Sequence, residues 1–130
     1  MNKNLTQYCM YESDPIMNAI ERIEKNNMRT IFVLNSSDKV VGVVSQGDIL
    51  RAIINGSNLY VQANKIMTTS FAYLTSKDLN KAMKLFKTKY FSLIPILSND
   101  FKLKDVILFT DLINILEPQE KVVKNQTKIK

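Results

Sequence analysis

An internal repeat constrains the fold of this 130-residue chain more than any other feature of its sequence. A shift of 63 residues superposes residues 13–54 on residues 76–117 without a gap, and ten positions match in apolar character. A unit of about sixty residues buries little core by itself, so we expect the two copies to pack together. Seven further positions are identical: Ser13/Ser76, Ala19/Ala82, Ile31/Ile94, Leu34/Leu97, Lys39/Lys102, Val43/Val106 and Asp48/Asp111.

The first copy opens with a short extended segment at Tyr8–Tyr11, and an amphipathic helix is predicted to follow it. Ser13 or Asp14 is expected to cap this helix. Pro15 is expected at its first position, where the missing N–H costs no hydrogen bond. The inward face carries apolar residues at helical spacing, namely Ile16, Ala19, Ile20 and Ile23.

A hairpin and a second helix complete the first copy. Thr30–Leu34 and Val40–Val44 are apolar and rich in β-branched residues, and the residues Asn35–Lys39 between them favour a turn. The second helix is predicted to begin at Gly47-Asp48 and to end at Asn55-Gly56. Its inward-facing residues are predicted to be Ile49, Leu50 and Ile53.

The second copy repeats this plan from an extended segment at Phe71–Leu74. Its first helix is predicted to start from a Ser76 cap and to run through Phe86, and its last helix to start at Thr110. The strands between them are predicted at Leu93–Leu97 and Leu103–Leu108. The sequence therefore predicts an α+β chain with two β-α-β-β-α units, at residues 5–56 and 57–117, and a C-terminal tail at 118–130.

The positive charge lies mainly in that tail. The whole chain has a formal net charge of +6, and residues 121–130 contain four lysines and no acid. We interpret the tail as a linker or a frayed end, and less readily as an arm that binds a partner. The copies themselves show no basic helix with base-reading residues and no row of stacking aromatics, so nucleic-acid binding is disfavoured.

Missing residue types argue against most enzyme classes. The chain has no His, the commonest general base and imidazole metal ligand. Its single cysteine, Cys9, excludes an internal disulfide and a thiolate zinc cluster, and its three glycines form neither a Walker loop nor a GxGxxG motif. An enzyme is therefore the least favoured class. The lone cysteine, the absence of a secretory apolar core and the absence of a membrane-length apolar segment favour a cytoplasmic protein without membrane contact.

Several segments resemble the CBS domain pair, also called the Bateman module. The first copy carries G-V-V-S-Q-G-D-I from Gly42 to Ile49, which matches the family pattern G-h-h-[ST]-x-x-D-h, where h is apolar. The equivalent segment from Asp105 to Leu112 keeps the acid but loses the glycine and the hydroxyl. Leu93–Ile96 is similar to the family's L-P-V step, and Lys65–Thr68 to its entry into a second repeat. The resemblance covers roughly residues 5–117 and implies a sandwich-like pair of repeats with pseudo-two-fold symmetry.

This resemblance implies that AMP, ADP or ATP binds in a cleft between the copies, which offers two possible sites and requires no other cofactor. In the better site, Asp48 is expected to accept hydrogen bonds from the ribose hydroxyls, and Ser45 to donate to phosphate. Gln46 and Gly47 are expected to bring backbone N–H groups close to the ligand. The adenine is expected to contact the second copy's extended segment, at Thr68, Thr69, Phe71 and Ala72.

The second site is expected to use Asp111 for ribose. Leu108 replaces the hydroxyl there, and Thr110 is the adjacent substitute. Arg29 and Lys89 precede apolar strands and are candidates for phosphate. Each of these residues also has a purely structural interpretation: the two acids as ordinary helix-start residues, Ser45 as a cap, Phe71 as core, and the cations as solvated surface charges.

The resulting functional hypothesis is a non-catalytic module that senses an adenine nucleotide and regulates a partner domain or protein, with a homodimer expected. The alternative is a dimerisation scaffold whose sites have lost their ligand. The segment G-V-V-S-Q-G-D-I-L-R-A-I-I-N-G-S-N-L is also similar to CBS pairs attached to sugar-phosphate nucleotidyltransferases, although Gln46 and Leu50 depart from that pattern. A detached regulatory half of such an enzyme is therefore a further alternative.

Overall fold

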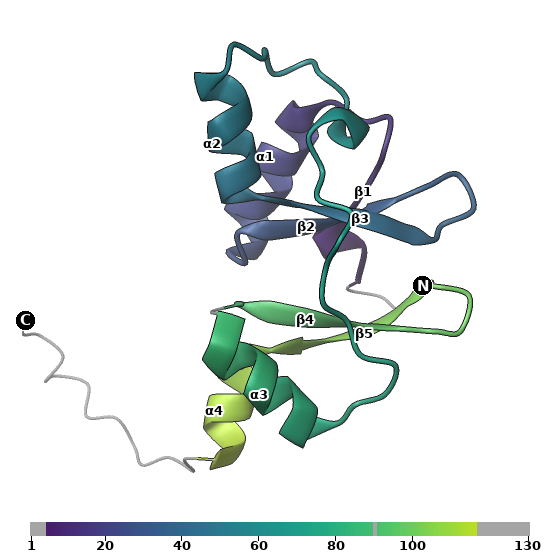
Figure 1. The fold of residues 1–130 in the computed structure, drawn as a ribbon, viewed down its shortest axis with the longest axis vertical. Helices are drawn as coiled ribbons and strands as arrows, with labels where there is room; N and C mark the ends of the chain where they lie inside the picture. The colour runs from purple at the N-terminus through teal and green to yellow at the C-terminus, as the bar shows by residue number, and fades with distance from the viewer. Residues whose placement is uncertain (1–4, 90, 117–130) are drawn as a thin grey trace, which may run out of the picture.

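The computed structural model describes residues 5–89 and 91–116 (Figure 1), so the predicted basic tail at 118–130 lies outside the described residues. The first copy contains the 3₁₀ helix η1 (Leu5–Tyr8), β1 (Cys9–Tyr11), α1 (Ile16–Asn26), β2 (Thr30–Leu34), β3 (Val40–Ser45) and α2 (Gln46–Ile54). A linker with the short 3₁₀ helix η2 (Ala63–Lys65) leads to α3 (Leu79–Lys89), β4 (Leu93–Leu97), β5 (Leu103–Leu108) and α4 (Phe109–Leu116). The α+β class and the predicted hairpins are confirmed.

Each copy forms its own small sheet. In the first copy β2 lies between β1, to which it is parallel, and β3, to which it is antiparallel. In the second copy β4 and β5 form an antiparallel pair. The pairing register shifts between Val33 and Leu34 in the first hairpin and between Ile96 and Leu97 in the second, which are equivalent positions.

The predicted extended segment Phe71–Leu74 is not a strand. Only Leu74 pairs with β4, as an isolated parallel bridge to Ile96. The N–H of Leu74 donates to the carbonyl of Pro95 at 3.0 Å, so that edge of β4 faces the segment. A proline has no N–H to offer on the same edge, so the ladder seen between β1 and β2 cannot be completed here.

The helix starts differ from the prediction. α2 and α4 begin one residue earlier than predicted, at Gln46 and Phe109, and α1 and α3 differ in their caps. Pro15 is the N-cap of α1 and is extended (φ −72°, ψ 155°), because it pairs with Gln62 of the linker. The carboxylate of Asp14 accepts a hydrogen bond from the N–H of Tyr11 at 2.9 Å and caps a turn instead. At the start of α3, Asp78 replaces Ser76 as the cap, because it lies next to the first apolar residue and accepts from the N–H of Lys81 at 3.1 Å. Helix α3 also continues past Phe86 to Lys89.

The two sheets face each other, and the helices cover their outer faces (Figure 1). One apolar cluster fills the space between the sheets and draws residues from both copies, including Phe32, Leu34, Leu93 and Leu97. Two further clusters lie between each sheet and its own helices. The copies therefore share a core, as expected for units too small to be stable alone.

Helix α2 buries a narrower stripe than predicted. Ile49 and Ala52 are buried against the sheet and α1, whereas Leu50 and Ile53 are exposed. The stripe that reaches the sheet consists of Ile49 and Ala52, which are three residues apart. Leu50 and Ile53 form the neighbouring stripe, which borders a surface groove beside α1. The helix ends as predicted, with Asn55 as the C-cap and Gly56 at a φ of 96°.

Candidate functional site

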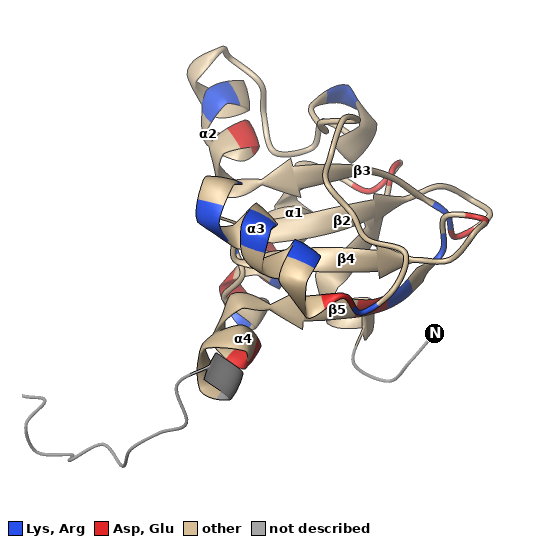
Figure 2. Cartoon of the chain, turned by 60° about the horizontal axis from the view of Figure 1, so that its bottom comes forward, with Lys and Arg blue, Asp and Glu red and all other residues tan. Residues whose placement is uncertain are grey.

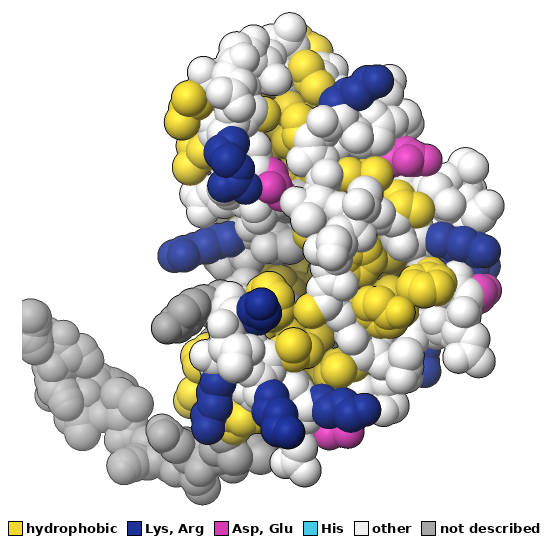
Figure 3. Space-filling view, in the orientation of Figure 1, with side chains coloured by type: hydrophobic (Ala, Val, Ile, Leu, Met, Phe, Trp, Pro, Cys, Tyr) yellow, Lys and Arg dark blue, Asp and Glu magenta, His cyan; other side chains and the backbone are white. Residues whose placement is uncertain are grey.

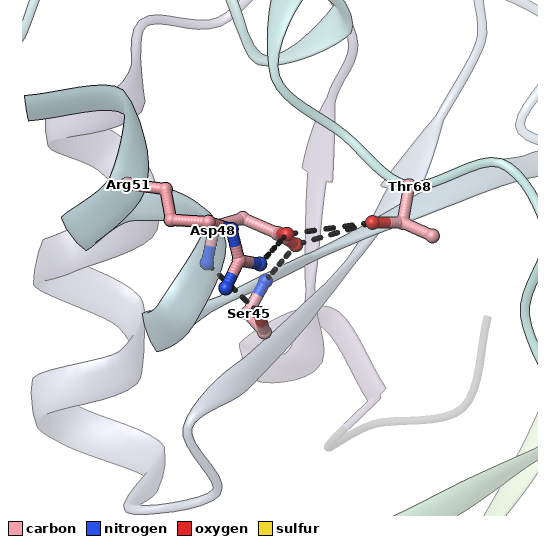
Figure 4. Close-up of polar contacts among 4 residues, drawn as sticks. All are labelled: Ser45, Asp48, Arg51 and Thr68. Atoms are coloured by element: carbon pink, nitrogen blue, oxygen red, sulfur yellow. Dashed lines mark hydrogen bonds and ion pairs between the residues drawn. The ribbon is translucent and has the colours of Figure 1, made fainter. Parts of the chain in front are cut away.

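The N-terminus of α2 is held by a capping box in which Ser45 and Asp48 exchange hydrogen bonds (Figure 4). The hydroxyl oxygen of Ser45 accepts from the N–H of Asp48 at 3.1 Å, and Oδ2 of Asp48 accepts from the N–H of Ser45 at 2.9 Å. The two residues form the hydroxyl and acid positions of the sequence motif. The three-residue spacing of Ser45 and Asp48 therefore serves to cap the start of α2.

The carboxylate of Asp48 also contacts two further side chains. Oδ1 accepts from Nη2 of Arg51 at 2.8 Å, and the hydroxyl of Thr68 lies 3.4 Å from Oδ1 and 3.5 Å from Oδ2. The side chain of Asp48 is only 9% exposed, while that of Arg51 is 69% exposed. The carboxylate is thus held in place by the capped start of its own helix. The solvent-exposed guanidinium of Arg51 covers it.

The linker crosses the first sheet beside this carboxylate. Thr68 and Val43 exchange backbone hydrogen bonds of 2.8 and 2.9 Å. The linker therefore pairs with the edge of β3 as a one-residue antiparallel bridge. A Cβ added to Gly42 would lie 2.8 Å from Sδ of Met67 and 3.0 Å from the carbonyl oxygen of Thr68. The motif's glycine therefore lets the linker pass close enough to bring Thr68 to Asp48.

A cleft of about 490 Å³ opens between the two copies at this point. Figure 3 shows the hollow in the middle of the molecule, with basic and acidic side chains in contact on its upper edge. One wall comes from β2, β3 and α2, and the other from the linker, the end of α3 and β4. Its lining residues are Thr30, Phe32, Val43, Ser45, Asp48, Arg51, Thr68, Ser70, Phe71, Ala72, Lys89, Phe91, Leu93 and Pro95.

Half of the twelve predicted site residues line this cleft: Ser45, Asp48, Thr68, Phe71, Ala72 and Lys89. The structure places Gln46 elsewhere, in the groove between α1 and α2, because the first helical residue points away from the capped side. The lining of the cleft, in the part of the chain that the structure describes, includes neither Gly47 nor Thr69. Arg29 and Thr110 line a separate cavity of about 470 Å³ with Phe86 and Phe91.

Sequence reasoning missed Arg51, the cation closest to Asp48. The available signal was its spacing, since residues three apart on a helix lie on the same face. The walls contributed by the strands and by the linker were missed as well, because they depend on how the copies pack. These residues are Thr30, Phe32, Val43, Ser70, Phe91, Leu93 and Pro95.

Comparison with known proteins agrees with this architecture. Residues 1–55 match the family model of the CBS domain. The first copy is therefore similar to a CBS domain. The CBS domains of a transcriptional regulator from Streptococcus pneumoniae have the same fold over 88% of this chain and 93% of that one, with a TM-score of 0.72 and 19% identity. The recognised CBS fold therefore extends over both copies.

Two further relatives add context. A CBS domain protein from Pyrobaculum aerophilum complexed with AMP is similar over 79% of this chain and 80% of that one, with a TM-score of 0.67 and 20% identity. An uncharacterised 17.7 kDa protein of Acidianus ambivalens is 24% identical over 84% of this chain, which spans 66% of that relative's length. The association with a sugar-phosphate nucleotidyltransferase stays a prediction.

The region around Asp111, which the repeat relates to the Asp48 cleft, has a different lining. The 63-residue shift relates Thr68 and Phe71 of the open cleft to Leu5 and Tyr8 of η1. These two residues are 5% and 9% exposed and belong to the apolar cluster between the sheets. Burial, and then the negative charge of Asp111, raises the pKa of Tyr8. The positions equivalent to Thr68 and Phe71 of the open cleft are therefore occupied by core side chains of η1, while Asp111 itself is exposed.

Within the described residues, no helix is long and apolar enough to cross a membrane. The same residues contain no group of three or more His, Cys, Asp or Glu side chains that could hold a metal ion.

Proposed function

We propose that the Asp48 cleft binds an adenine nucleotide and that the chain is a non-catalytic regulatory module. The observation that carries this proposal is the placement of Asp48: a carboxylate fixed at a helix start that faces a cleft lined by both copies. The volume of about 490 Å³ lies within the roughly 300–1,000 Å³ of typical ligand pockets. A structural relative complexed with AMP supports the choice of ligand.

The side chains around the cleft suit the parts of such a ligand. The carboxylate of Asp48 can accept hydrogen bonds from both ribose hydroxyls. The hydroxyl of Ser45 still has a hydrogen to donate, since its contact with Asp48 uses only its oxygen as an acceptor. Lys89 supplies a positive charge from the second copy for phosphate, and Phe71 with Ala72 offers an apolar surface for the base.

Regulation follows from the position of the cleft. Because its walls come from both copies, a bound nucleotide favours whichever arrangement of the copies contacts it best. A partner domain or protein that senses this arrangement is then coupled to the nucleotide, and the coupling acts in both directions.

Calorimetric titration with AMP, ADP and ATP tests the proposal. We expect saturable binding of at least one of them to the wild-type chain and a loss of that binding in Asp48→Asn, which keeps an oxygen to cap Ser45. The matched control is Asp111→Asn at the equivalent position of the second copy, outside the lining of this cleft, which should bind as the wild type does. Absence of saturable binding to the wild type at millimolar nucleotide contradicts the proposal.

We also propose that the chain forms a homodimer through α1 and α2. These helices border a groove of about 360 Å³ lined by Ile20, Ile23, Ile49, Leu50 and Ile53. Leu50 is 55% exposed, and Ile54 nearby is 80% exposed; Figure 3 shows apolar side chains along the outer edge of α2. Contiguous exposed apolar residues of this kind mark association surfaces. Sedimentation of Leu50→Glu should give a monomer where the wild type gives a dimer, and a monomeric wild type contradicts this proposal.

A further inference from the structure

We propose that Arg51 is an exchangeable counter-ion that makes the cleft select phosphorylated adenosine over adenosine itself. Arg51 forms an ion pair with Asp48, and on nucleotide binding it transfers to the ligand's phosphate while the ribose takes its place on the carboxylate. This inference rests on the proposed nucleotide binding and names the specificity of that same site.

The geometry creates a competition for one oxygen atom. Oδ2 of Asp48 is held by the N–H of Ser45 as part of the helix cap. Nη2 of Arg51 already donates to the other oxygen, Oδ1, at 2.8 Å (Figure 4). The hydroxyl of Thr68 lies further from the carboxylate, at 3.4 Å from Oδ1 and 3.5 Å from Oδ2. A ribose hydroxyl that binds Oδ1 therefore has to displace the guanidinium, or share the oxygen with it.

The ion pair is easy to exchange. Arg51 is 69% exposed and is joined to Asp48 over a single helical turn. Solvated pairs of this kind contribute little to stability, because water and salt weaken the attraction and the side chain loses freedom. Its release leaves the helix cap intact, since the cap uses other atoms of Ser45 and Asp48.

The released guanidinium has an obvious new partner only when the ligand carries phosphate. Arg51 and Lys89 line the cleft from opposite copies, so two cations border the space next to one carboxylate. A guanidinium binds phosphate oxygens through parallel hydrogen bonds that are stronger than neutral ones. Adenosine breaks the same ion pair but carries no phosphate for Arg51 to bind. Its affinity for the cleft is therefore lower than that of AMP.

The test compares AMP with adenosine on the intact chain by calorimetric titration. The variants are Arg51→Ala and, as the control for the loss of one positive charge, Lys84→Ala, an exposed residue of α3 that is not among the residues lining the cleft. Figure 2 shows basic residues along α3. Loss of a charge-assisted hydrogen bond predicts AMP binding weakened roughly ten- to a hundredfold in Arg51→Ala. Adenosine binding should stay the same or tighten, by up to about fivefold, because Asp48 is freed.

These opposite responses distinguish a specificity role from a structural one. If the affinities for AMP and for adenosine fall by the same factor in Arg51→Ala, Arg51 only shapes the site and the inference is overturned. Arg51→Lys keeps the charge without the planar fork, and it should give an intermediate ratio of AMP to adenosine affinity. If the wild-type chain binds neither ligand, the proposed nucleotide binding itself is contradicted. If it binds AMP and adenosine equally well, only the proposed selectivity is contradicted.

Discussion

Lys39 and Lys102 pair with each other as an isolated antiparallel bridge between the copies, and they occupy the same position in the repeat. Antiparallel pairing of equivalent residues is what a local two-fold axis produces. The N–H of Val40 donates to the carbonyl of Phe101 at 2.8 Å beside the bridge. The axis therefore passes between the two hairpin turns, and the predicted pseudo-two-fold packing is present in the backbone.

The same axis relates two sites that differ in the residues around their acid. Around Asp48 the equivalent positions hold Thr68 and Ser45, and the cleft is open. Around Asp111 they hold Leu5 and Leu108, and both belong to or pack against the core between the sheets. The symmetry of the backbone is thus kept, while core residues replace two of the cleft-lining residues in the second copy of the site and Asp111 itself is exposed.

Gly42→Ala should destabilise the fold, whereas Gly47→Ala should not. A Cβ at Gly42 meets Met67 and the linker carbonyl of Thr68 within 3.0 Å, so the linker has to shift. Overpacking of this kind costs about 1–3 kcal/mol. A Cβ at Gly47 meets the flexible end of Arg51 at 3.4 Å and Oγ of Ser45 at 3.7 Å, which are ordinary contacts, and alanine favours a helix over glycine by up to about 1 kcal/mol. Urea unfolding measures both, and equal stabilities for the two variants would contradict the account of the linker crossing.

Ser45→Ala should lower the free energy of unfolding by about 1 kcal/mol through loss of the N-cap. The hydroxyl of Ser45 satisfies the N–H of Asp48, which has no partner inside the helix. Ser45→Thr keeps the acceptor and serves as the control, with stability close to that of the wild type. A Ser45→Ala chain as stable as Ser45→Thr in urea would show that the capping box contributes little to folding.

Much of this fold follows from local sequence. The strands Thr30–Leu34, Leu93–Leu97 and Leu103–Leu108 were predicted with their observed bounds, because apolar β-branched runs are flanked by clear turn residues. The 63-residue shift also gave the equivalence of Asp48 and Asp111. Helix starts were less accurate: Pro15 is extended because it pairs with Gln62, a contact that no local pattern shows.

The site was only half predictable, since its walls depend on packing between the copies. Lys89 and Phe71 reach the cleft with Asp48, whereas Arg29 and Thr110 border another cavity. One feature was available in the sequence and was overlooked. Continuing the repeat toward the N-terminus pairs Leu5 with Thr68, which predicts an apolar residue where the open cleft has a hydroxyl.

Tyr8→Ala should cost more stability than Phe71→Ala, although the two aromatics are equivalent in the repeat. Tyr8 is buried in the shared core, and truncation of a buried aromatic costs about 3–5 kcal/mol. Phe71 borders the open cleft and is only partly buried, so its truncation should cost roughly 1–2 kcal/mol. Chemical denaturation of the two variants gives the comparison. Equal losses would mean that the second cleft is as open in solution as the first.

Stability should fall at alkaline pH through Cys9. Burial raises the pKa of this thiol from 9.0 to about 12, with Arg22 lowering it and Asp38 raising it by smaller amounts. The folded chain therefore keeps a proton that the unfolded chain releases above pH 9. Because the unfolded state then binds fewer protons, the free energy of unfolding decreases by about 1.4 kcal/mol per pH unit between pH 9 and the folded pKa.

Urea unfolding at pH 8 and pH 10 measures this slope, and Cys9→Ala isolates the contribution of the thiol. The variant is expected to be less stable than the wild type at pH 8, because a buried side chain is shortened. Its loss of stability between the two pH values should nevertheless be smaller by about 1 kcal/mol, since the titrating group is gone. Tyr8, whose pKa is also raised, adds to the decline in both proteins only above its ordinary value of 10.0. Parallel pH profiles for the wild type and Cys9→Ala would show that the thiol is solvated in the native state.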